Sequence, residues 1–272
     1  MEFTQQHQYA FNKYKNGENI FITGPGGSGK SIFIKKLVKY ANDYDIEISV
    51  CAMTGCAALL LECGAKTIHS WGGFGIAKGK NSEIADNIAN NKYKRTNWRK
   101  VQILVVDEIS MLSYKLFELM ELTARKTRKN EKLFGGIQLV FCGDFFQLPP
   151  VGDNDDIFTR KFCFESELFD KVFPNENKIQ FTKIFRQKDI IYSKILNKLR
   201  VGKISQKGIH ELNKCIGKTC QNKSLVRPTI IHPLKSNVEQ INQKSLHDLP
   251  GEISSFNINY ELLDIEDIPN NK

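Results

Sequence analysis

The sequence has no apolar run near the ~20 residues that a membrane-spanning helix needs. Its opening residues, 1–6, hold neither a basic nor an apolar stretch, so we expect no signal peptide there. The seven cysteines include no pair at CxxC spacing, which disfavours a zinc site and favours isolated thiols in a reducing compartment. These absences argue against a membrane-embedded or disulfide-rich secreted protein, and we expect no membrane partner.

Acidic residues are outnumbered by basic ones. The 272 residues include 39 Lys and Arg against 30 Asp and Glu, which gives a net charge of +9. Hydrophobic residues make up 41% and charged residues 25%, as in an ordinary globular chain of one or two domains. The positive charge favours a polyanionic partner, nucleic acid before membrane, although a merely charged surface has the same composition.

Short apolar runs alternate with helical patterns over the first half of the chain. Apolar spacing predicts helices from 31 to about 40 and from about 112 to 129. The expected strands are 19–23, 46–52, 102–106 and 137–142. This alternation predicts the α/β class, with a parallel sheet and helices on both of its faces.

Other parts of the chain have weaker patterns. Residues 72–100 are rich in Gly, Lys and Asn and poor in apolar periodicity, so we interpret them as a small insertion or exposed arm. Later patterns predict helices at 189–201, 206–216 and 234–247, a strand at 228–232 and a loose acidic end at 261–272.

A glycine-rich segment carries the clearest chemistry. Gly24-Pro25-Gly26-Gly27-Ser28-Gly29-Lys30-Ser31 matches G-x-x-x-x-G-K-[ST] at every fixed position. It follows an expected strand and opens an expected helix, which is the context of a phosphate-binding P-loop. Its backbone N–H groups and the helix N-terminus favour phosphate oxygens. We expect Lys30 to reach the β- and γ-phosphates of a nucleotide and Ser31 to ligate Mg²⁺.

Two acids follow the third expected strand. Asp107 and Glu108 come directly after Leu104-Val105-Val106, at the strand end where parallel sheets carry their sites. We expect Asp107 to hold the Mg²⁺ shell and Glu108 to orient or deprotonate an attacking water. A protein that only binds nucleotide does not need Glu108, so this pair favours hydrolysis.

Further motifs narrow the class. They are Thr54-Gly55-Cys56-Ala57-Ala58, Thr67-Ile68-His69-Ser70-Trp71, Asp107-Glu108-Ile109-Ser110-Met111, Gly143-Asp144-Phe145-Phe146-Gln147-Leu148-Pro149-Pro150-Val151 and Ile184-Phe185-Arg186-Gln187, followed by 196–202. In this order they resemble the petite-integration-frequency (Pif-type) DNA helicases of helicase superfamily one, near the RecD and Dda helicases. The resemblance runs from about residue 3 to about residue 247.

The resemblance implies a RecA-like motor that hydrolyses ATP with Mg²⁺. Such a motor moves 5′ to 3′ on single-stranded DNA and separates forked duplex DNA. Gln147 would sense the γ-phosphate and the attacking water, and Arg186 would act as an arginine finger, although a lone Arg is more often part of a surface ion pair. These roles are expectations that the resemblance carries onto this sequence.

The resemblance also places Thr54, His69 and Trp71 in a DNA-facing segment. Thr54 would bind phosphate, and an aromatic ring would stack on a base. Core packing of Trp71 and a structural hydrogen bond of His69 are the alternatives. The basic run 92–100 suits a strand-separating wedge or DNA contact, or else a solvated face.

In family terms, residues 1–71 and 98–227 form a first RecA-like domain and 72–97 an inserted wedge-like domain. Residues 228–272 resemble only the start of a second RecA-like domain, so we expect the motor half of a helicase, whose other half a separate chain could supply.

The sequence also departs from the family pattern at the position that recognises adenine. His7 stands where the family's adenine-reading glutamine is expected, and either Gln6 or Gln8 could substitute for it.

The leading hypothesis is an ATP hydrolase, the motor half of a 5′–3′ DNA helicase. The alternative is an ATP-gated fragment that binds single-stranded DNA or has a regulatory role, and that no longer translocates. An RNA helicase of the same superfamily is a third possibility. The expected location is intracellular, with nucleus, cytoplasm and a viral replication site all compatible. Replication, recombination and repair are likewise all compatible with this hypothesis.

Overall fold

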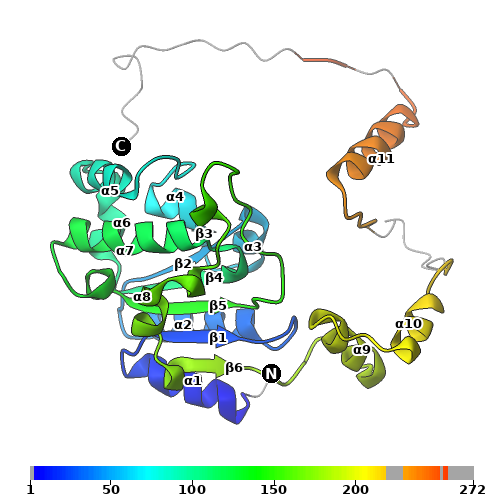
Figure 1. Ribbon diagram of the computed structural model, residues 1–272, viewed down its shortest axis with the longest axis horizontal. Helices are drawn as coiled ribbons and strands as arrows, with labels where there is room; N and C mark the ends of the chain where they lie inside the picture. The colour runs from blue at the N-terminus through cyan, green and yellow to red at the C-terminus, as the bar shows by residue number, and fades with distance from the viewer. Residues whose placement is uncertain (1–2, 219–228, 252–253, 257–272) are drawn as a thin grey trace. The chain divides into compact units, whose positions relative to one another are not determined.

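Six parallel strands form one sheet in the order β3-β2-β4-β5-β1-β6 (Figure 1). The structure is a computed structural model that describes residues 3–218, 229–251 and 254–256. The strands are β1 (Ile20–Thr23), β2 (Ile48–Ala52), β3 (Lys66–Thr67), β4 (Ile103–Asp107), β5 (Gln138–Gly143) and β6 (Lys178–Gln180). The four strands predicted at 19–23, 46–52, 102–106 and 137–142 are confirmed as β1, β2, β4 and β5. The edge strands β3 and β6 were missed because two or three residues are too few to show an alternating pattern.

Side chains of the central strands alternate between two apolar cores, one on each face of the sheet. In β4, Leu104 and Val106 belong to one core, and Ile103 and Val105 belong to the other. All four are buried, because helices cover both faces. The predicted α/β class is therefore confirmed.

Helices α1 (Gln5–Lys15) and α2 (Lys30–Asp43) pack on one face of the sheet, where Phe11, Phe33 and Leu37 enter the core. The opposite face is covered by α4 (Ile68–Gly72), α5 (Asn81–Asn90), α6 (Lys94–Lys100), α7 (Tyr114–Arg128) and α8 (Glu167–Val172). The remaining α-helices between residues 3 and 214 are α3 (Gly55–Leu60), α9 (Ile190–Arg200) and α10 (Gln206–Asn213). The helices predicted at 31–40, 112–129, 189–201 and 206–216 correspond to α2, α7, α9 and α10.

The segment 72–100 is more ordered and more buried than its sequence indicates. Helix α5 packs against α7, with Ala85 and Ile88 in the core. Trp98 in α6 is fully buried, and its Nε1 donates a hydrogen bond to the Gly72 carbonyl oxygen at 3.0 Å. The ring of Trp98 therefore packs inside the protein, although its basic run reads as a surface. The division of the chain into an ATPase domain and an inserted wedge stays a prediction.

Contacts divide the chain into two units, Met1–Lys214 and Cys215–Lys272. In the second unit, α11 (Lys235–His247) matches the helix predicted at 234–247. The strand predicted at 228–232 is not formed at 229–232, its described part. A strand needs a neighbouring strand to pair its backbone N–H and C=O groups, and the described residues of this unit contain none. The prediction for 261–272 lies outside the described residues.

Among the residues that the structure describes, no helix combines the length and apolar character required to cross a bilayer.

The packing of Trp98 can be tested by truncation. Trp98→Ala should lower the free energy of unfolding by about 3–5 kcal/mol, because it removes a fully buried indole and its hydrogen bond. Tyr93 is the matched control, since it lies in the same basic run but is 87% exposed. Tyr93→Ala should change the free energy of unfolding by less than about 0.5 kcal/mol. Urea unfolding followed by circular dichroism measures both, and equally small effects would contradict the buried position.

Candidate active site

The loop from Gly24 to Gly29 joins β1 to α2 and packs closely against another part of the chain. Gly24 has φ +151°, and a Cβ atom there would lie 2.4 Å from the carbonyl oxygen of Phe181. Gly27 has φ +80°, and a Cβ atom there would lie 2.6 Å from Cβ of Arg186. Both positions therefore require glycine. The Phe185 N–H also donates to the Gly27 carbonyl oxygen at 2.8 Å, so the segment that carries Arg186 is held directly on the loop.

Lys30, the first residue of α2, is held inside this loop. Its Nζ donates hydrogen bonds to the carbonyl oxygens of Gly24 (2.7 Å) and Pro25 (3.2 Å), and the residue is only 8% exposed. Ser28 is fully buried, and its Oγ has no hydrogen-bond partner among the described residues. The loop thus places a buried cation beside its backbone N–H groups, where phosphate oxygens would accept hydrogen bonds from both.

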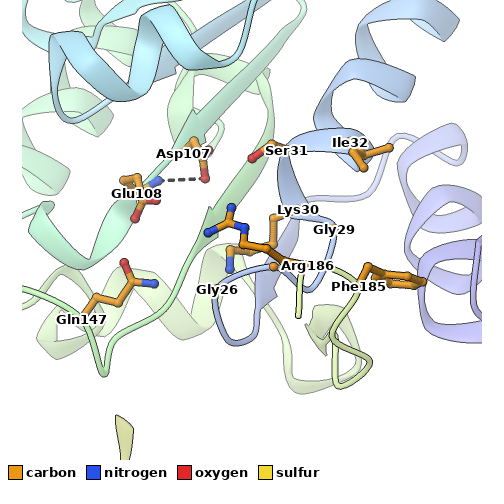
Figure 2. A pocket seen from close by; sticks show the side chains of 11 residues that line it. Gly26, Gly29, Lys30, Ser31, Ile32, Asp107, Glu108, Gln147, Phe185 and Arg186 are labelled. Atoms are coloured by element: carbon orange, nitrogen blue, oxygen red, sulfur yellow. Dashed lines mark hydrogen bonds between the residues drawn. The ribbon is translucent and has the colours of Figure 1, made fainter. Parts of the chain in front are cut away.

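A cavity of about 380 Å³ opens in front of the loop (Figure 2). It is lined by residues from four segments of the chain, namely Gly26, Gly27, Gly29, Lys30, Ser31, Ile32, Asp107, Glu108, Gln147, Phe185 and Arg186. Each predicted catalytic and metal-ligating residue is in this list. Of the predicted phosphate-binding loop, Gly24 supports Lys30, Ser28 lies buried behind the loop, and Pro25 lines a neighbouring hollow that also contains Arg186.

Asp107 and Glu108 stand at the carboxyl end of β4. Asp107 is 5% exposed, and its Oδ1 accepts a hydrogen bond from the Glu108 N–H at 2.9 Å. Burial, and then the negative charge of Glu108, raise the pKa of Asp107 to about 6, while that hydrogen bond and the charge of Lys30 oppose the rise. Buried carboxylates of this kind favour a bound cation.

The oxygen atoms of the cavity suit Mg²⁺. Figure 2 shows the hydroxyl of Ser31 directed toward the carboxylate of Asp107. A hydroxyl and a carboxylate are hard oxygen ligands, which Mg²⁺ prefers, particularly together with phosphate oxygens. Glu108 and Gln147 lie on one side of the cavity, and Arg186 extends into it from the other (Figure 2). This arrangement can bind a nucleoside triphosphate and bring a carboxylate that accepts protons and a cationic side chain to its terminal phosphate.

A model of the PIF1-like helicase family matches residues 4–209. The chain belongs to the PIF1-like helicase family. It is 38% identical over 247 residues to the ATP-dependent DNA helicase RRM3 of Saccharomyces cerevisiae, a match that covers 89% of this chain and 33% of that protein. The chain therefore spans about a third of the length of this relative.

Solved structures agree with this assignment. The Pif1 helicase of Candida albicans has a TM-score of 0.83 and 31% identity, covering 93% of this chain and 56% of that one. A Bacteroides Pif1 helicase in complex with ADP-AlF3 and single-stranded DNA has a TM-score of 0.78 and 26% identity, covering 93% of this chain and 58% of that one. These neighbours support the RecA-like fold predicted from the sequence.

The three DNA-facing residues predicted by the Pif-type resemblance lie in different environments. Thr54 caps α3, where its Oγ1 accepts a hydrogen bond from the Ala57 N–H at 3.2 Å, and it lines a hollow of about 630 Å³ together with Gln147. His69 is half-buried, and burial lowers its pKa. Trp71 is 5% exposed and packs edge-on against Trp98, with ring centroids 4.7 Å apart. Its ring thus follows the alternative of core packing.

His7, aligned with the adenine-reading glutamine of Pif-type helicases, lies in the core instead of facing the cavity. It is fully buried, with its ring stacked on Phe181 at 3.9 Å between centroids and its Nδ1 hydrogen-bonded to Thr4 Oγ1 at 2.6 Å. Gln6 Oε1 accepts a hydrogen bond from the Thr182 N–H at 3.1 Å. Both side chains therefore support the segment that follows β6.

Two residues of the cavity were not assigned a role from the sequence. Ile32 and Phe185 provide apolar surface away from Glu108 and Gln147 (Figure 2). From the sequence, Phe185 is noted only as a neighbour of Arg186, and Ile32 only lies within the helix predicted from 31 to about 40. The sequence shows that both residues are apolar, but nothing in its pattern indicates that their side chains face a ligand rather than the core.

Burial of His7 makes stability depend on pH. The pKa of His7 is lowered, first by burial, from its ordinary value of 6.5. As the pH falls through 6.5, the unfolded chain binds a proton that the folded chain does not, so stability falls. His7→Phe removes this titration, and its stability should decrease less than that of the unaltered chain between about pH 7.5 and pH 5.5. Urea unfolding at both pH values measures the difference.

Identical pH dependence in His7→Phe and the unaltered chain would contradict the lowered pKa of His7.

Proposed function

We propose that this chain carries the ATP-hydrolysing motor of a 5′–3′ DNA helicase, coupling hydrolysis to movement on single-stranded DNA and to duplex unwinding. The observation that carries the proposal is a single cavity in which groups for binding phosphate, holding Mg²⁺, activating water and offsetting charge converge. They are Lys30, Ser31, Asp107, Glu108, Gln147 and Arg186. Membership of the PIF1-like helicase family supports the choice of ATP and DNA as substrates.

The glycine loop and Lys30 bind the phosphates, with Lys30 turning from its carbonyl partners to the β- and γ-phosphate oxygens. Ser31 and Asp107 hold Mg²⁺, which supplies charge neutralisation on the phosphate oxygens when bound. Glu108 accepts a proton from the attacking water and Gln147 orients that water. Arg186 offsets the negative charge that develops on the transferred phosphoryl group.

Adenine rests against Ile32 and Phe185, whose apolar side chains suit a flat aromatic base. Neither His7, which is buried, nor Gln6, whose carbonyl oxygen is bound to Thr182, offers a preformed contact to that base. Selection for adenine over guanine then depends mainly on shape and stacking.

The hollow beside Thr54 is the proposed contact with DNA. It borders the active site, since Glu108 and Gln147 line both spaces. Its apolar members Leu60 and Leu148 are exposed, which suits contact with bases of a single strand. Single-stranded and forked duplex DNA are the proposed nucleic-acid partners, and a separate chain that carries the rest of the motor is a further proposed partner.

Hydrolysis can be tested directly. Purified protein should hydrolyse ATP faster when single-stranded DNA is added. Lys30→Ala should lose nucleotide binding, because the phosphates lose their buried cation. Glu108→Gln should keep binding but lose most turnover, by about 10²–10⁴-fold, since the amide cannot accept the proton. Phosphate release and fluorescent-nucleotide titration measure turnover and binding separately.

Each outcome decides between the hypotheses. Nucleotide and DNA binding without turnover would favour an ATP-gated binding or regulatory fragment. Stimulation by RNA strands equal to that by DNA would favour an RNA helicase. Appreciable hydrolysis by Glu108→Gln would remove the role assigned to that acid.

A further inference from the structure

The turn that follows β5 is bound to α9 by a paired ionic contact. Arg200, the last residue of α9, donates from Nε to Asp144 Oδ2 and from Nη2 to Asp144 Oδ1, both at 2.5 Å. The two residues are 56 positions apart in the sequence. The Asp144 side chain is 1% exposed and the Arg200 side chain 16% exposed. Such a two-point contact fixes direction as well as distance, because both partners are planar.

Asp144 also organises the turn itself. Its carbonyl oxygen accepts a hydrogen bond from the Gln147 N–H at 2.8 Å, and its Oδ1 accepts one from the Phe146 N–H at 3.2 Å. The guanidinium of Arg200 lies over the Phe146 ring, 4.5 Å from the ring centroid, although that ring is 61% exposed. Arg200 therefore holds the turn from 144 to 147 at two points, the Asp144 carboxylate and the Phe146 ring.

Gln147, at the end of this turn, borders both functional spaces. Gln147 lines the cavity in front of the P-loop (Figure 2). It also lines the hollow beside Thr54. Phe146 also lines the Thr54 hollow. A displacement of the turn would move the γ-phosphate sensor and the wall of the DNA hollow together.

Arg200 also lies near Arg186. Both side chains line one hollow of about 370 Å³, together with Asp144 and Gln147. The buried carboxylate of Asp144 neutralises Arg200, which reduces the repulsion that two guanidinium groups would otherwise exert across this space.

We propose that Arg200 is a positioning residue, which holds the 144–147 turn so that nucleotide at Gln147 and DNA at the Thr54 hollow act on each other. This inference rests on the proposed function and assigns to Arg200 no contact with nucleotide or DNA. A role in stability alone explains the pair less well, because burying an ion pair contributes little net stability. Helix α9 has few other anchors in the described structure, since Ile195 is its buried residue.

The first test is kinetic. Arg200→Ala should leave the Kd for nucleotide within about twofold, because the P-loop contacts remain. It should lower the DNA-stimulated kcat by about 10- to 100-fold, the effect expected of a displacement near 1 Å at a reacting group. Arg200→Lys keeps the charge but loses the two-point contact, so it should recover only part of the DNA stimulation.

Arg125→Ala is the matched control. Arg125 on α7 pairs through Nε with the buried Glu121 at 2.6 Å and also contacts Glu131. The variant removes the same charge and a comparable ion pair outside both functional spaces. It should keep the DNA stimulation of the unaltered chain even where its stability falls. Equal loss in both variants, or full stimulation in folded Arg200→Ala, would overturn the proposal.

The second test does not depend on turnover. Hydrogen exchange at the amides of Phe146 and Gln147 should become at least about tenfold faster in Arg200→Ala and stay unchanged in Arg125→Ala, because only the first releases the turn. Unchanged exchange in Arg200→Ala would overturn the positioning role. If the unaltered chain shows no DNA-stimulated hydrolysis but the two variants show this exchange pattern, the proposed function is refuted. Arg200 then remains the anchor of the turn.

Discussion

Parallel pairing of β4, β5 and β1 is the constraint on which the site depends. These strands are neighbours in the sheet, and all run in the same direction. Their carboxyl ends therefore meet at one edge, where Asp107 ends β4, the turn beginning at Asp144 follows β5, and the loop beginning at Gly24 follows β1. Three segments that are distant in the sequence thus line one cavity, because each of them begins at the carboxyl end of a neighbouring strand.

Burial of polar groups at this edge of the sheet lowers the stability of the fold. Lys30 and Asp107 are nearly buried, and Ser28 Oγ has no partner among the described residues. Glu108 adopts the left-handed conformation, with φ 56° and ψ 42°, which is energetically unfavourable for a residue other than glycine. Buried charge and backbone strain of this kind recur at functional sites, because ligand phosphates and a metal ion satisfy groups that the protein alone does not.

The turn from Asp144 to Gln147 connects the nucleotide cavity to the rest of the protein. On one side it carries Gln147, the proposed γ-phosphate sensor, and on the other it is bound to Arg200 at the end of α9. The sheet fixes where the turn begins, and α9 fixes how it is oriented. Motion of α9 would therefore reach Gln147 and the cavity that it lines through a single buried carboxylate.

The sequence alone predicted the nucleotide site that we propose, because the P-loop and the Asp107-Glu108 pair depend on local residues in a fixed order. It also determined the four strands β1, β2, β4 and β5, whose apolar runs are long enough to form a pattern. Only the tertiary structure decided which aromatic and polar side chains are buried. Trp71 and Trp98 pack together in the core, and His7 lies under Phe181, although each occurs among residues that read as surface or ligand-binding. The pairing of Asp144 with Arg200 was equally invisible, because a contact between distant residues depends on how the strands and helices pack and leaves no local pattern in the chain.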